Sequence, residues 1–271
     1  YEYRAVKPGG RPLHVARVMP GEPGECYTLD DYRNRYAIYK LDPDLQAAHA
    51  STPFFMSFDD HEVENNWAGF KSEVKGTTLA AMALRRAAAF QAWFEHMPLR
   101  SPQSPKGSSI LAHRRIDIGT LIQLNILDTR QYRSPQACGD GWKVCPEAKA
   151  KERTMLGKAQ EDWLTGNFRQ KRAAWTVLAQ QVPVARFDRN PDPAITEVHM
   201  DKWDGAEAAR TRLFDAIANE PGMALSFQME PGDFQLLNNY CVLHARTNFE
   251  DHAEPARRRH VLRLWLATPN S

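Results

Sequence analysis

The sequence is most informative in the stretch Pro53-Phe54-Phe55-Met56-Ser57-Phe58-Asp59-Asp60-His61-Glu62-Val63-Glu64-Asn65-Asn66-Trp67. A short apolar run bounded by Pro53 is typical of a buried strand, and polar residues follow it at once. Carboxylate oxygens and one imidazole nitrogen at the end of a strand suit a divalent or trivalent metal ion, beside which His61 would protonate a departing oxyanion. An acidic exit from the strand that caps a following helix explains the same residues without a metal.

Residues 59–66 resemble the motif W-D-D-H-E-V-x-N-N of PhoD-type alkaline phosphatases, which belong to the metallophosphoesterase superfamily. Phe58 stands where that family usually has tryptophan. The resemblance implies that Asp60 is a metal ligand and that His61 is the acid that protonates the leaving group. It also implies Fe(III) and Ca(II) as the metal ions and a small-molecule phosphoester as the substrate.

The composition is that of an ordinary globular protein. With 271 residues, 42% of them hydrophobic and 25% charged, the chain is long enough for one large domain or two small ones. The formal charge of +2, from 35 basic and 33 acidic residues, gives no argument for a nucleic-acid partner. No apolar run approaches the length of about 18 residues that a membrane span needs, so we expect no membrane span.

The chain begins at Tyr1 without an initiator methionine or a signal peptide. Tyr1-Glu2-Tyr3 matches the end of the PhoD-type motif G-D-Y-I-Y-E-Y, which implies that Tyr1 is a metal ligand and that an aspartate three residues earlier is missing. Cys138 and Cys145 flank a loop with Gly and Asp and can form a small disulfide, which favours an exported parent enzyme, periplasmic or extracellular. The location of this chain itself stays open.

Capping residues and apolar periodicity predict several helices and strands. The predicted helices cover residues 29–39, which follow Thr28, and residues 44–50, 77–96 and 206–218, while 153–164 matches a PhoD-type helix. The predicted strands cover residues 53–58, 110–116, 121–127 and 175–182, with a turn at Gly119 between the second and the third. Strands that alternate with helices argue for an α/β fold rather than an all-β barrel.

Residues 128–134 match a second PhoD-type string, L-D-T-R-Q-Y-R-S. Arg130 and Arg133 are candidates for binding phosphate, because guanidinium forks match phosphate oxygens. An arginine that closes a salt bridge at the exit of a strand is the alternative. Residues 153–164 and 200–205 continue the resemblance to the same family.

The C-terminal part carries a different resemblance. The T-G-D-I-H motif and the later histidine of PhoD-type enzymes are absent after Asn219, and residues 223–246 and 257–266 resemble the last strands of TauD-type Fe(II)/2-oxoglutarate dioxygenases. That resemblance implies His244 as an iron ligand and Arg259 and Arg263 as residues that bind 2-oxoglutarate or substrate. The single H-x-D sequence, His199-Met200-Asp201, lies inside a phosphatase-like string, and we interpret it as a coincidence.

We therefore expect two pieces: an incomplete PhoD-like metallophosphatase domain over 1–221 and a fragment of a TauD-like dioxygenase over 222–271. The fold class is α/β, with a truncated metallophosphoesterase-like α/β sandwich and a C-terminal antiparallel β hairpin that pairs 233–243 with 259–267. The expected function is metal-dependent hydrolysis of phosphoesters, impaired by the missing metal ligands. The alternatives are an Fe(II)/2-oxoglutarate-dependent dioxygenase and a non-catalytic chimeric fragment.

Overall fold

The computed structural model describes residues 24–170, residues 173–220 and Glu254. The chain divides into two compact units, residues 1–225 and 226–271, and the elements named below all belong to the first. The predicted C-terminal hairpin and the candidate site residues Tyr1, His244, Arg259 and Arg263 lie outside the described residues. In the described part of the chain, no helix has the length and apolar character to cross a membrane.

The described part opens with three capped helices, α1 (Leu29–Lys40), α2 (Pro43–Ser51) and α3 (Leu79–His96). Thr28 caps α1: its side chain accepts the Asp31 N–H, and the Asp31 carboxylate accepts the Thr28 N–H in return. Asp42 and Thr78 accept backbone N–H groups at the starts of α2 and α3. The helices predicted over 29–39, 44–50 and 77–96 are therefore confirmed.

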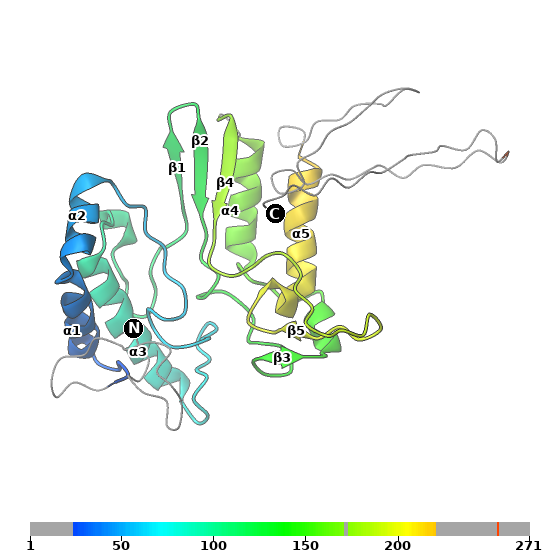
Figure 1. Ribbon diagram of the computed structural model, residues 1–271, viewed down its shortest axis with the longest axis horizontal. Coiled ribbons are helices and arrows are strands. Elements are labelled where there is room, and N and C mark those ends of the chain that lie inside the picture. Colours follow the sequence, from blue (N-terminus) through cyan, green and yellow to red (C-terminus); the bar gives the residue numbers. More distant parts are fainter. Residues whose placement is uncertain (1–23, 171–172, 221–253, 255–271) are drawn as a thin grey trace. The chain divides into compact units, whose positions relative to one another are not determined.

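Helices α1 and α3 lie side by side (Figure 1) and enclose the first hydrophobic core. The core is mostly aromatic, and the segment between the two helices contributes to it as well. Its largest buried side chains are Tyr32, Tyr36, Phe58, Trp67, Phe90 and Trp93. The residues on both sides of the polar stretch 59–66 are therefore fixed in this core.

A three-stranded sheet follows, with β1 (Arg114–Ile118) antiparallel to β2 (Ile122–Ile126) and β4 (Trp175–Ala179) parallel to β2. The predicted hairpin and its turn are confirmed, and Gly119 has the positive φ of 55° that the turn requires. The first strand begins at 114 rather than 110. At Ile110 the backbone N–H and C=O pair with the side-chain amide of Gln131 instead of a neighbouring strand.

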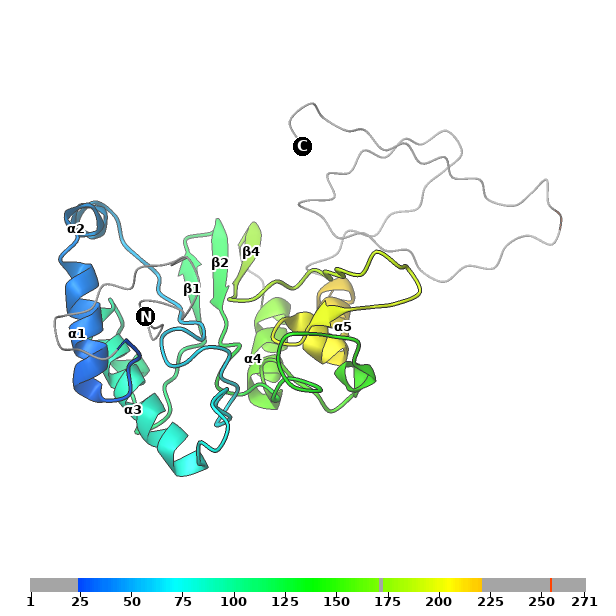
Figure 2. The same ribbon diagram turned by 60° about the horizontal axis from the view of Figure 1, so that its bottom comes forward.

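Helices α4 (Lys158–Arg169) and α5 (Glu207–Ala218) form a second core with Leu127 from the end of β2. Figures 1 and 2 place both helices on the β4 side of the sheet, with α1 and α3 on the β1 side. α4 begins later than the matched string, because Gly157 has a φ of +71° and Thr154 accepts the N–H groups of residues 156 and 157.

Two short strands, β3 (Trp142–Lys143) and β5 (Val198–His199), form a separate antiparallel pair. Beside them a disulfide joins Cys138 to Cys145, and this confirms the predicted pairing. The backbone N–H of Met200 also donates to the carbonyl of Gly141 at 2.9 Å. The loop that the disulfide closes is thus attached to the segment around residue 200.

The predicted strand over 53–58 is wrong. The segment has no regular secondary structure and pairs with no strand in the described part of the chain. The Met56 carbonyl instead accepts a hydrogen bond from the Arg114 side chain, and Phe58 is buried in the helical core. The described residues form a mixed α/β structure with two small sheets.

Candidate functional site

The polar stretch 59–66 forms a tight turn between buried apolar anchors. Phe58, Val63 and Trp67 are 2%, 0% and 0% exposed, and they fix the start, the middle and the end of the turn. Inside it the N–H groups of Val63 and Glu64 both donate to the carbonyl of Asp60 at 2.8 Å. The spacing of the apolar residues therefore leaves Asp59 and His61 near the surface.

Asp60 and His61 lie together at this turn. The Asp60 side chain is buried, and its Oδ2 accepts the backbone N–H of Asn66 at 2.8 Å. The Nε2 atom of His61 lies 3.6 Å from the same oxygen, while its side chain is 32% exposed. A buried carboxylate and an accessible imidazole therefore lie side by side at this turn. The metal-ligand role of Asp60 and the acid role of His61 stay predictions.

Arg130, which follows β2, joins this turn to a distant aspartate. Its Nη1 and Nη2 donate to the two carboxylate oxygens of Asp201, each at 2.8 Å, and its Nε donates to Asp59 Oδ1 at 2.6 Å. Its Nη2 also lies 3.8 Å from Asp60 Oδ1. The guanidinium is 1% exposed, so these carboxylates surround it inside the protein.

Arg133 pairs with the same aspartate. Its Nη2 donates to the Asp201 carbonyl at 2.9 Å, and its Nη1 lies 3.1 Å from Asp201 Oδ1. Burial lowers the pKa of Arg133 to about 10, against the charge of Asp201. Burial would raise the pKa of Asp201, but the charges of Arg133 and Arg130 outweigh it and keep that pKa below its ordinary value.

The structure thus shows both arginines in the salt bridges that the sequence left as the alternative to phosphate binding. Their phosphate role stays a prediction, and it would require these guanidinium groups to contact phosphate while they hold Asp201. The same salt bridges engage the carboxylate of Asp201, which is the acidic residue of the H-x-D sequence.

Asp59 completes the electrostatics of this cluster. Partial burial raises the pKa of Asp59, the charge of Arg130 lowers it, and neighbouring Asp60 raises it again, with a net upward shift. Three carboxylates (Asp59, Asp60 and Asp201) face two guanidinium groups, which leaves one negative charge in excess. Such an excess favours a proton or another cation near Asp59.

Glu64 is a structural residue of the site that the sequence did not reveal. Its carboxylate is 1% exposed and accepts the Ser72 hydroxyl, the Glu73 N–H at 2.8 Å and Arg85 Nη1 at 2.9 Å. Arg85 belongs to α3, so this ion pair attaches the turn to the helical core. The local sequence carries no signal for it, because the arginine lies 21 residues away.

The described donors around Asp60 do not by themselves fit a metal ion. One Asp60 oxygen accepts an amide and the other faces Arg130, and no third histidine, cysteine or carboxylate of the described residues joins Asp60 and His61 in a ligand cluster. The remaining ligands would have to come from elsewhere, and the candidate Tyr1 lies outside the described residues.

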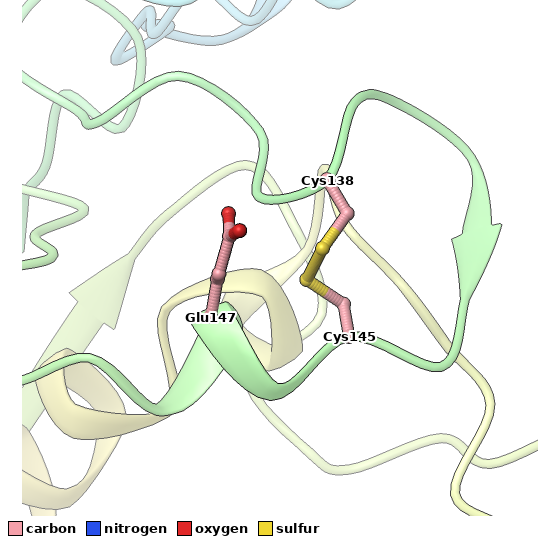
Figure 3. Close-up of side chains that lie close together, drawn as sticks. All are labelled: Cys138, Cys145 and Glu147. Carbon is pink, nitrogen blue, oxygen red and sulfur yellow. A yellow bond between two sulfur atoms is a disulfide. The ribbon is translucent and has the colours of Figure 1, made fainter.

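A different group of three donors does lie close together in the described part, namely Cys138, Cys145 and Glu147. Figure 3 shows the two sulfur atoms joined in the disulfide, with the Glu147 side chain beside them. Sulfurs bonded to each other offer no thiolate to a metal. This group therefore serves as a crosslink.

Comparisons with known proteins agree with the first resemblance. A family model described as PhoD-like phosphatase matches residues 1–225. Alkaline phosphatase D of Bacillus subtilis (strain 168) is 46% identical over 209 residues, which cover 76% of this chain and 35% of that protein. A solved "Structure of PhoD" is similar, with a TM-score of 0.74 and 42% identity over 82% of this chain and 42% of that one.

FR-33289 synthase of Streptomyces rubellomurinus (strain ATCC 31215) is 36% identical over 59 residues, or 21% of this chain and 17% of that protein. Apart from Glu254, the dioxygenase-like piece expected over 222–271 lies outside the described residues, and it stays a prediction. This chain spans about a third of the length of the Bacillus phosphatase. On the match over residues 1–225, the chain belongs to the PhoD-like phosphatase family.

Proposed function

We propose that this chain is part of a metal-dependent hydrolase of small phosphoesters, of the alkaline phosphatase or phosphodiesterase type. The observation that carries the proposal is the Asp60–His61 pair, in which an accessible imidazole lies 3.6 Å from a buried carboxylate. The family and the 46% identity to an alkaline phosphatase support the same reaction.

In this proposal His61 protonates the oxygen of the departing alcohol. The carboxylate of Asp60 stabilises the charged imidazole before the transfer, and the hydrogen bond from Asn66 holds that carboxylate in place. A positioned general acid contributes a factor of about 10² to 10⁴ to the rate.

The family implies metal cofactors, and the proposed ions are Fe(III) and Ca(II). They require ligands beyond Asp60, for which Tyr1 is the candidate. Turnover by this chain alone is expected to be slow, because its described residues hold no complete ligand set around Asp60.

We extend the proposal to the fold and the compartment. The similarity to the solved PhoD structure supports a metallophosphoesterase-like sandwich, of which the described sheet would form a part. The disulfide between Cys138 and Cys145 supports an exported parent enzyme, because disulfides persist in oxidising compartments.

The test is hydrolysis of an aryl phosphate and an aryl phosphodiester at alkaline pH, with and without added Fe and Ca. We expect slow, metal-stimulated hydrolysis that falls about a hundredfold or more in His61→Ala and is lost in Asp60→Ala. His49→Ala is the matched control, because His49 pairs with Lys40 and Phe54 on the helical side. Equal rates in the wild type and His61→Ala, or no effect of metal, would favour the non-catalytic fragment.

A further inference from the structure

Asn66 is held from three directions. Its backbone N–H donates to Asp60 Oδ2, its side-chain Nδ2 donates to Asp140 Oδ2 at 2.6 Å, and its carbonyl accepts Gln136 Nε2 at 2.5 Å. Its φ of +50° lies in the left-handed region, which asparagine adopts more readily than other residues with a Cβ atom. The two contacts made by its side chain and its carbonyl come from outside the turn.

Two of these contacts come from one short segment. Gln136 and Asp140 lie on either side of Cys138, whose disulfide to Cys145 closes the segment into a loop. We call residues 136–145 the disulfide loop. Its contacts with Asn66 join parts of the chain that are 70 and 74 residues apart.

The disulfide loop also supports the other side of the site. Its Gly141 carbonyl accepts the Met200 N–H, and β3 within the loop pairs with β5 just before Asp201. The side chain of Gln136 donates to Asp201 Oδ1 at 2.9 Å. Because Asp201 holds Arg130, which in turn holds Asp59, the loop is connected to both ends of the Asp59–Asp60 pair.

We propose that Asp140 is a positioning residue, which the Cys138–Cys145 disulfide holds against Asn66 so that Asn66 fixes the carboxylate of Asp60 beside His61. The role of Asp60 in catalysis rests on the proposed function. The positioning itself depends only on the contacts above. A dithiol reductant that supplies two electrons and two protons would convert the disulfide to two thiols, become a disulfide itself, and release the loop.

The test measures hydrogen exchange of the Asn66 backbone amide by NMR in the intact chain, because that amide donates to Asp60. Asp140→Ala removes the acceptor for the Asn66 side chain and should raise the exchange rate about tenfold. Asp140→Asn keeps a side-chain oxygen that accepts the same bond, and it should restore slow exchange. The amide of Leu127, which donates to the Ala179 carbonyl between β2 and β4, is the internal control and should not change.

The second part of the test removes the disulfide between Cys138 and Cys145. Reduction with a dithiol, and separately the double substitution Cys138→Ser with Cys145→Ser, should raise Asn66 exchange as Asp140→Ala does. Unchanged Asn66 exchange in Asp140→Ala and after reduction would overturn the proposal. Equal acceleration at Leu127 and Asn66 would overturn it too, because it would show general destabilisation. Neither measurement needs turnover or metal, so the proposed function can fail while the positioning role holds.

Discussion

Arg130 joins two acidic residues that lie far apart in the sequence, Asp59 and Asp201. Asp59 and Asp201 lie 71 residues from it on opposite sides along the chain, and their carboxylates bracket a guanidinium that is 1% exposed. A buried cation with several carboxylate partners is costly to remove, because the carboxylates then lack a counter-charge. The stability of the protein without substrate therefore distinguishes a structural arginine from one that serves only to bind phosphate.

We predict that Arg130→Met lowers the free energy of unfolding by about 3 to 5 kcal/mol, because it leaves Asp201 and Asp59 without their shared cation. Arg186→Met is the control: Arg186 is exposed and bonds only to the Thr196 hydroxyl among the contacts described, so its loss should cost less than about 0.5 kcal/mol. Urea denaturation measures both. If Arg130→Met and the wild type had equal free energies of unfolding, the result would favour phosphate binding as the role of Arg130.

For single residues, the sequence identified candidate site residues better than it identified their interaction partners. Asp60 and His61 were found through one continuous motif, because they are neighbours in the chain. The partners of Arg130 and Glu64 could not be found in this way, because each ion pair forms only when distant segments pack together. The spacing of residues along the chain therefore does not indicate which of several arginines forms the ion pair with a buried aspartate.

Helices α1 and α3 are joined at the surface by Arg33 and Glu95. Arg33 donates from Nε and Nη2 to the two oxygens of Glu95, each at 2.7 Å. Hydrogen bonds from Arg33 are the main cause that lowers the pKa of Glu95 to about 2. The pKa of Glu95 is lower in the folded state than in the unfolded state, where it is 4.5. The stabilising effect of the pair is therefore present above pH 4.5 and is lost as the pH falls from there toward 2.

We predict that Glu95→Gln is less stable than the wild type by about 0.5 to 1 kcal/mol at pH 7, since solvent screening limits a surface pair. The difference should shrink as the pH is lowered from 4.5 toward 2. Urea midpoints between pH 7 and pH 3 measure it, with Glu152→Gln as the control because Glu152 is exposed. A difference that stays constant down to pH 3 would contradict the assignment.

The helices α1, α2 and α3 begin with local caps at Thr28, Asp42 and Thr78. No side chain caps α4 or α5, so the apolar period alone predicted the helix over 206–218. The strand over 53–58 was predicted from an apolar run, and it failed because Phe58 and Met56 pack against the helical core while no neighbouring strand pairs with the run among the described residues. β3 and β5 were missed because strands of two residues are too short to show alternation. Their pairing depends on the disulfide loop rather than on periodicity.

For the whole molecule, the sequence strings predicted the family well. They placed the phosphatase part over 1–221, and the family match covers 1–225. The end of the phosphatase part and the nature of the tail stay predictions, because resemblance locates a change of family only to within a few residues. The described residues form two small sheets, and the complete sandwich stays a prediction.

The last prediction concerns the alternative oxygenase function. A facial iron site needs two histidines and one carboxylate, and His244 needs two partners from a sequence such as His199-Met200-Asp201. In the structure Asp201 accepts hydrogen bonds from Arg130 and Gln136 and lies 3.1 Å from Arg133. To bind iron, that carboxylate would have to leave these partners, and Arg130 and Arg133 would lose their shared counter-charge inside the protein.

We therefore expect no Fe(II)-dependent conversion of 2-oxoglutarate to succinate by this chain, and equally low succinate release in the wild type, His244→Ala and Asp201→Asn. Succinate measured by mass spectrometry, with Fe(II), ascorbate and 2-oxoglutarate present, checks this. Release that needs Fe(II) and disappears in both variants would contradict this expectation and would favour Asp201 and His244 as iron ligands. In that case the ion pairs of Asp201 with Arg130 and Arg133 would have to open when iron binds.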